Sequence, residues 1–122
     1  MFVLLFSFLS VVYFEERFNR GWERNWIKSE KHPPGKPFGR WQCTAGSTPG
    51  NPSIQRGIKT LDNYRHYCIS SKFQKCLVKE DKSKPLIVQY THKQDRPVVC
   101  GGLYLKLFPD GLDQKRFTGG TP

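Results

Sequence analysis

The sequence lacks the patterns that are typical of helical and repeat proteins. No long window places apolar residues at a 3.6-residue period, and no internal repeat or low-complexity tract is present. Hydrophobic residues make up only 37% of the 122 residues, whereas aromatic residues reach 14% and glycine and proline together number 20. This balance favours short strands and loops over helices. The length allows one domain at most.

Recognisable catalytic and zinc-binding arrangements are also lacking. The sequence offers no Ser/His/Asp constellation and no paired carboxylates, so we predict that the protein is not an enzyme. It has no C-x-x-C pair, and its three histidines are dispersed, which argues against zinc. In an oxidising compartment, the four cysteines would allow two disulfides with three possible connectivities. These cysteines are Cys43, Cys68, Cys76 and Cys100.

Acidic residues are scarce relative to basic ones. Ten Asp and Glu residues against 20 Lys and Arg residues give a formal net charge of +10. Such a balance permits binding to nucleic acid, an anionic membrane or an acidic protein. The basic residues are scattered, however, and no RNP-like, zinc-finger or helix-turn-helix pattern accompanies them. A solvated basic surface is the favoured interpretation, and a basic nucleic-acid-binding module is the alternative.

Long apolar runs are lacking after the first twelve residues. Residues 1–12 (MFVLLFSFLSVV) form the one continuous apolar run, which is too short to span a bilayer as a helix. The length is typical of the hydrophobic region of a signal peptide, although no basic residue precedes it and no A-x-A-like site follows it. A buried strand is the competing interpretation. We therefore expect a signal peptide or apolar head at 1–12, one domain at 13–122 and no transmembrane segment.

The clearest strand patterns come late in the chain. Residues 65–73 (RHYCISSKF) alternate, and residues 86–90 (LIVQY) are rich in β-branched and aromatic side chains. Residues 103–108 (LYLKLF) alternate almost without fault, with leucines on one face and Tyr104, Lys106 and the final Phe on the other. We expect 86–90 and 103–108 at the centre of the sheet.

Shorter elements are expected before these strands. The spacing of Trp22 and Trp26 suggests a helical turn, and three prolines make 31–39 a loop. Brief strands are expected at 12–18, 40–45 and 57–61. Together the patterns predict an all-β chain, a sandwich with mostly antiparallel pairing.

Five stretches carry a further signal through their order and spacing. They are 12–18 (VYFEERF) with 21–22 (GW) and 24–26 (RNW), 57–60 (GIKT) with 64–65 (YR), 67–70 (YCIS), 86–90 (LIVQY), and 100–108 (CGGLYLKLF) with 112–114 (LDQ) and 121–122 (TP). They resemble the calreticulin/calnexin family, and most of all the N-terminal lectin portion of plant-like calreticulins. The stretch at 100–108 is the most specific.

The resemblance implies a fold and a function. The fold would be a partial, concanavalin-A-like jelly-roll sandwich, an incomplete lectin domain over 13–122 that chain farther downstream completes. The function would be that of a calcium-dependent, lectin-type chaperone of the endoplasmic reticulum lumen. Its partners would be unfolded glycoproteins and their monoglucosylated N-glycans, and no nucleic acid would be involved.

Tyr104 and Lys106 correspond to the family's sugar-binding Tyr and Lys. Residues i and i+2 of a strand share a face and lie about 6.5–7 Å apart, a span that suits one sugar ring. Tyr offers an apolar plane and a hydroxyl, and Lys offers three donors. From the residues alone, an ordinary amphipathic strand facing water is the alternative. The chain departs from the family at Leu103, where a third glycine is usual, and at Val99, where an acidic residue is usual.

The resemblance also assigns a disulfide cysteine and a calcium site. Cys100 matches the family's disulfide-forming cysteine, whose partner would lie beyond residue 122, and the other three cysteines match none. The calcium carbonyls would come from Arg17, Ile54 and Arg56, together with a downstream Asp. Calcium takes six to eight oxygen ligands that include carboxylates, so these carbonyls alone would not hold it.

Overall fold

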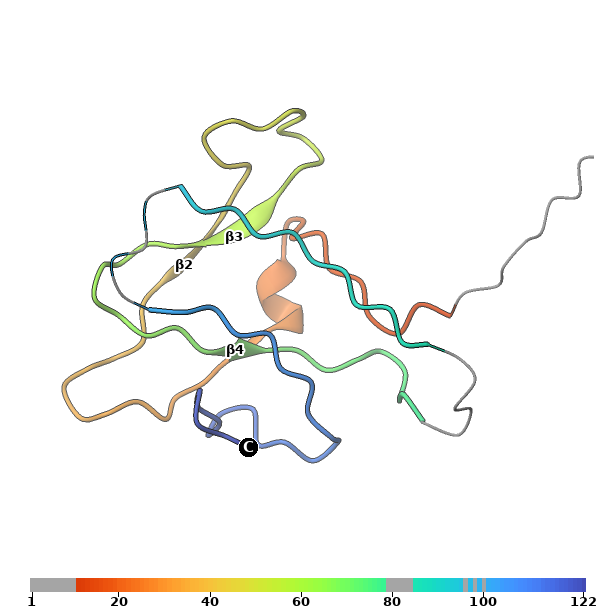
Figure 1. The fold of residues 1–122 in the computed structure, drawn as a ribbon, viewed down its shortest axis with the longest axis vertical. Helices are drawn as coiled ribbons and strands as arrows, with labels where there is room; N and C mark the ends of the chain where they lie inside the picture. Colours follow the sequence, from red (N-terminus) through yellow and green to blue (C-terminus); the bar gives the residue numbers. More distant parts are fainter. Residues whose placement is uncertain (1–10, 79–84, 96, 98, 100) are drawn as a thin grey trace, which may run out of the picture.

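The computed structural model describes residues 11–78, 85–95, 97, 99 and 101–122, and its regular elements are few and short. Over these residues it contains no α-helix, and no helix is long and apolar enough to cross a membrane. The chain is all-β, as predicted, with loops and turns over most of its described length (Figure 1). The elements are the 3-10 helix η1 (Trp22–Asn25) and the strands β1 (Ile27–Lys28), β2 (Trp41–Thr44), β3 (Gly57–Thr60) and β4 (Ile69–Ser70).

The four strands form two separate antiparallel pairs. β2 pairs with β3 in a register that sets Trp41 opposite Thr60 and Thr44 opposite Gly57. β1 pairs with β4, with Ile27 opposite Ser70. The strands predicted at 40–45 and 57–61 are confirmed to within one residue at each end, and the helical turn at Trp22 is confirmed as η1.

Three of the predicted strand assignments are wrong. Residues 86–90 and 103–108 run as irregular chain without a ladder of backbone hydrogen bonds, and so do residues 12–18. Of the long strand predicted at 65–73, only β4 forms. Alternation of side chains describes the two faces of a strand, but a strand also needs a neighbour for its N–H and C=O groups. In the described part of the chain, β2 and β3 pair only with each other, and the same holds for β1 and β4.

Aromatic rings in the N-terminal part of the described chain form a cluster. The Phe18 ring meets the rings of Trp22 and Trp26, each at a centroid distance of 5.8 Å. Phe14 extends the cluster to Trp26 at 5.8 Å and to Phe73 at 5.9 Å. Trp22 is only 5% exposed, so η1 directs this ring into the core. The cluster therefore joins the start of the chain to the segment after β4.

A second contact ties the residue after β1 to the segment around Phe117. Ser29 is buried, and its hydroxyl donates to the carbonyl oxygen of Phe117 at 2.6 Å. Phe117 is the other large apolar side chain that is buried among the described residues, and its ring meets Phe108 at 6.2 Å. Because Trp22 and Phe117 are far apart in sequence, the small core depends on contacts between distant segments.

Gly39 provides a close approach that no other residue could make. Its amide donates to the His66 carbonyl at 2.9 Å, and an added Cβ would lie 2.2 Å from the Tyr67 ring. The Tyr67 hydroxyl accepts from the Asp62 amide at 2.6 Å and donates to the Asp62 carbonyl at 2.7 Å, and its ring meets Trp41 at 5.0 Å. A side chain at position 39 would therefore displace the ring that joins β2 to the turn after β3.

We expect Gly39→Ala to open this region locally. Overpacking of this kind costs about 1–3 kcal/mol, so the Asp62 amide should exchange its hydrogen roughly tenfold faster or more. Exchange measured by NMR tests this without requiring global unfolding. Gly57→Ala is the matched control, because no atom lies within 4 Å of a Cβ added there. Unchanged exchange in Gly39→Ala would show that Tyr67 is not held as described.

Candidate functional site

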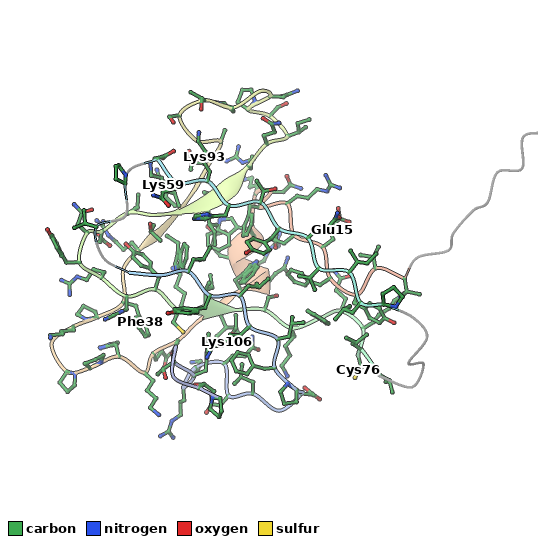
Figure 2. The ribbon with its side chains drawn as sticks, viewed as in Figure 1. Glu15, Phe38, Lys59, Cys76, Lys93 and Lys106 are labelled. Carbon is green, nitrogen blue, oxygen red and sulfur yellow. The ribbon has the colours of Figure 1, made fainter. Side chains whose placement is uncertain are left out.

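Tyr104 and Lys106 lie in the irregular segment 101–108 and are both exposed. Tyr104 keeps 78% of its surface accessible, and neither side chain is in the core. Gly101 begins the segment at a positive φ of 123°, which turns the chain before the two residues. The segment passes β4 in Figure 1, and Figure 2 labels Lys106 there. The exposure meets the first requirement of a binding site, and the binding role stays a prediction.

The Lys106 ammonium is held by a turn near the end of the chain. It donates to the carbonyl oxygens of Gly119 at 2.7 Å and Thr121 at 2.8 Å. The turn is closed by the Thr121 amide, which donates to the Thr118 carbonyl at 3.0 Å. An ammonium has three donors, so one remains for a ligand. Sequence reasoning missed these partners, although the Gly119–Gly120 pair is a turn signal that could have indicated them.

Gly102 lies under the Tyr104 side chain. A Cβ added at Gly102 would stand 3.3 Å from the Tyr104 hydroxyl oxygen. The missing side chain therefore lets the tyrosine fold back over the backbone while its ring remains largely exposed. Leu103, which replaces the usual family glycine, is also exposed rather than packed in the core. The segment thus presents an aromatic ring and a cation within two residues of each other.

Cys68 lies next to this segment, on the chain leading into β4. Its thiol is 3.7 Å from the Phe117 carbonyl oxygen. Burial raises the pKa of the Cys68 thiol, and the positive charge of Lys106 partly offsets that rise. Cys43, Cys68 and Cys76 are all unbonded thiols, whereas Cys100 lies outside the described residues.

The residues assigned to calcium by resemblance do not fit that ion. The Ile54 carbonyl accepts the Arg56 amide at 3.2 Å, and Arg17 pairs with Glu15. Among the described residues, no three His, Cys, Asp or Glu side chains gather as a metal site would require. Without a carboxylate cluster among the described residues, these three carbonyls alone do not provide the oxygen ligands that Ca²⁺ takes.

A salt bridge next to β2, between an arginine and an aspartate, shifts the pKa of the aspartate by a large amount. The Arg40 guanidinium donates from Nη2 to Asp62 Oδ1 at 2.7 Å, and the Arg40 amide donates to Oδ2 at 2.8 Å. These hydrogen bonds lower the pKa of Asp62 to about 2. Arg40 and Asp62 join β2 to the turn after β3, so the pair is structural.

The Arg40–Asp62 pair predicts a particular acid response. Because the folded pKa of Asp62 lies below its unfolded value, the pair adds stability above about pH 4 and loses it as the pH falls toward 2. In the Arg40→Gln variant, the titration midpoint of the Asp62 carboxyl group should return toward about 3.9. Carboxyl carbon shifts followed by NMR against pH measure the midpoint. The matched control is Arg116→Gln, which removes an exposed arginine elsewhere and should leave the titration midpoint of Asp62 unchanged. A midpoint near 4 for Asp62 in the unmodified chain would contradict the pairing.

These features define an all-β chain with short antiparallel strands and an exposed Tyr–Lys pair. The model of the calreticulin family matches residues 13–122, and the chain therefore belongs to that family. Calreticulin of Bombyx mori is 43% identical over 112 residues, which are 91% of this chain and 27% of the relative. Calreticulin of Dictyostelium discoideum is 40% identical over 118 residues, 96% of this chain and 27% of the relative.

A mammalian relative gives the same result. Calreticulin of Oryctolagus cuniculus is 40% identical over 111 residues, 89% of this chain and 25% of the relative. The chain thus spans about a quarter of the length of the curated relatives it matches. No solved structure matches the chain significantly. The predicted resemblance is confirmed.

Proposed function

We propose that the chain acts as a lectin-type chaperone component of the endoplasmic reticulum lumen. It would bind unfolded glycoproteins through their monoglucosylated N-glycans. The observation that carries this proposal is the exposed Tyr104–Lys106 pair, which lies within the family-matched residues. Residues 1–12, the proposed signal segment, lie outside the described residues except for Val11 and Val12.

The pair has the chemistry to hold a sugar ring. The Tyr104 ring offers an apolar face to the C–H surface of a hexose, and its hydroxyl can donate or accept a hydrogen bond. The Lys106 ammonium, oriented by the Gly119 and Thr121 carbonyls, directs its remaining proton to a sugar hydroxyl. The role proposed for the pair is binding and not catalysis. Calcium takes no part at Arg17, Ile54 and Arg56 in this proposal.

The nucleic-acid alternative receives less support from the structure. Several lysines lie beside acidic partners. Lys59 and Lys93, labelled in Figure 2, both approach Asp95, at 2.7 and 3.7 Å respectively. Lys115 pairs with Glu30 at 3.0 Å. These pairs interrupt the positive surface that a phosphate backbone would follow.

Glycan binding in increasing salt tests the proposal. We expect the full chain to bind monoglucosylated high-mannose glycan in preference to the same glycan without its glucose. The affinity should change little with salt, because the contacts are hydrogen bonds and apolar stacking. Phosphate-driven binding would instead weaken steeply. Equal binding of both glycans, or tight salt-sensitive binding of an oligonucleotide alone, would contradict the proposal.

A further inference from the structure

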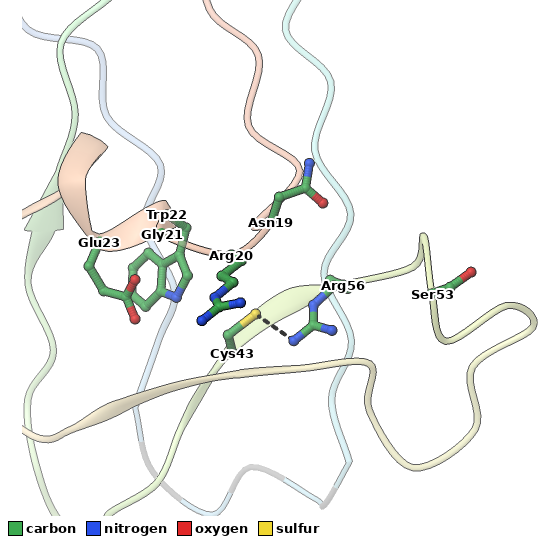
Figure 3. Close-up of a pocket in the computed structure, with 8 residues that line it drawn as sticks. All are labelled: Asn19, Arg20, Gly21, Trp22, Glu23, Cys43, Ser53 and Arg56. Carbon is green, nitrogen blue, oxygen red and sulfur yellow. Dashed lines mark hydrogen bonds between the residues drawn. The ribbon is translucent and has the colours of Figure 1, made fainter.

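An open hollow lies where the turn before η1 meets β2 and the loop before β3. Its volume is about 560 Å³, and Figure 3 shows the side chains that line it. It does not include Tyr104 or Lys106, so it is separate from the proposed sugar site. The residues that line it are Asn19, Arg20, Gly21, Trp22, Glu23, Cys43, Ser53 and Arg56.

A buried hydrogen-bond donor in the wall of the hollow has no partner. Trp22 is 95% buried, and its indole Nε1 is the one buried side-chain nitrogen or oxygen atom in the described part of the chain without a hydrogen bond. The indole N–H of Trp26, by contrast, donates to Glu16 at 3.0 Å. Leaving a buried donor unpaired is costly. In Figure 3 the Trp22 nitrogen lies on the side of the ring that faces Arg20.

Cationic groups gather on the same side of the hollow. Arg56 Nη2 lies 3.5 Å from Cys43 Sγ, while the Cys43 thiol donates to the Phe18 carbonyl at 3.1 Å. In the described chain, no carboxylate lies within ion-pair distance of Arg20 or Arg56. Glu23 is the one acidic residue in the lining, and Figure 3 draws it on the far side of Trp22 from Arg56.

We propose that this hollow binds a small oxyanion, a phosphate or carboxylate group. An anion between Arg20 and Arg56 would be attracted by both positive charges, and one of its oxygens would accept a hydrogen bond from the unpartnered Trp22 N–H. Guanidinium groups are well suited to both anions. Of the residues that the resemblance assigns to calcium, Arg56 alone lines the hollow, and its side chain favours a ligand of the opposite charge.

The indole signals of the three tryptophans report on this site directly. Inorganic phosphate is titrated into the full ¹⁵N-labelled chain at constant ionic strength, with chloride as the balancing salt. We expect the Trp22 indole signal, identified by its loss in Trp22→Phe, to shift and saturate. The Trp26 and Trp41 signals should stay in place. A parallel titration with acetate distinguishes a phosphate site from a carboxylate site. The anion that binds more tightly indicates the chemical group that the site takes.

Charge-matched variants separate a site from general attraction to a basic chain. Arg56→Gln should weaken the anion roughly tenfold or more, because it removes a hydrogen bond to a charged group. Arg116→Gln removes the same charge outside the hollow and should leave the affinity nearly unchanged. Equal losses in both variants would overturn the proposal. The absence of a saturable Trp22 shift with either anion would also overturn it, and the glycan-binding test is independent of both results.

Discussion

Tyr104→Ala is expected to abolish binding of monoglucosylated glycan. The ring supplies the apolar plane of the proposed site and is 78% exposed, so it is available to a ligand. Removing it also removes the hydroxyl, which leaves the Lys106 ammonium as the remaining member of the pair. One exposed cation with two of its donors on backbone carbonyls gives little affinity for a neutral sugar. Calorimetry or a glycan array measures the loss.

A second tyrosine provides the matched control for this variant. Tyr90 is also exposed and lies in the other irregular segment, 85–95. Tyr90→Ala removes the same side chain and should keep glycan binding within about twofold, a change that corresponds to less than the worth of one ordinary hydrogen bond. If Tyr104→Ala binds as tightly as the unmodified chain, the sugar contacts lie elsewhere. If both variants lose binding equally, a general loss of structure is the cause.

Urea is expected to unfold the chain over a broad range without a sharp transition. Trp22 and Phe117 are the two large apolar side chains buried in the described part, whereas Ile87, Leu103 and Leu105 are more than half exposed. Domains are stable by only about 5–15 kcal/mol even with full cores. A core this small gives little cooperativity, and the exposed apolar chain promotes association.

Tryptophan fluorescence against urea, with thiol counting in parallel, measures this. We expect a gradual change in emission and four titratable thiols, because Cys43, Cys68 and Cys76 are unbonded and therefore do not form a disulfide with the fourth cysteine. Leu105→Asp is the matched variant, since it lowers apolar exposure without touching the core. It should reduce aggregation and leave the emission curve unchanged. A steep transition, or Cys100 found in a disulfide, would contradict the prediction.

Local sequence signals predicted the elements that depend on nearby residues. β2 and β3 lie in short segments bounded by proline and glycine, and their pairing closes one loop between Thr44 and Gly57. The strands predicted at 86–90 and 103–108 do not form. The alternating pattern indicates which side chains would share a face, but it does not indicate which strand would pair with the segment. The family was recognisable because the order of short motifs does not depend on which strands pair.

The candidate site was predictable in part for the same reason. Alternation predicted that Tyr104 and Lys106 face away from the core, but the intervening leucines are exposed as well, so the whole segment and not one face of a strand is accessible. The carbonyls that hold the Lys106 ammonium come from residues 13 and 15 positions farther along, where only the folded turn brings them close. The unpartnered Trp22 nitrogen depends on packing among several segments, so no sequence pattern could reveal it.

The hydrogen bond from the Ser29 hydroxyl to the Phe117 carbonyl has a consequence for folding during synthesis. The two residues are 88 positions apart, so Ser29, which follows β1, lacks this contact until Phe117 has been made. At about 5–20 residues per second, that interval is roughly 4–18 s. Contacts of such high sequence separation also slow folding itself. A nascent chain therefore spends seconds with the Ser29 hydroxyl exposed to water and with the part of the core around Phe117 not yet formed.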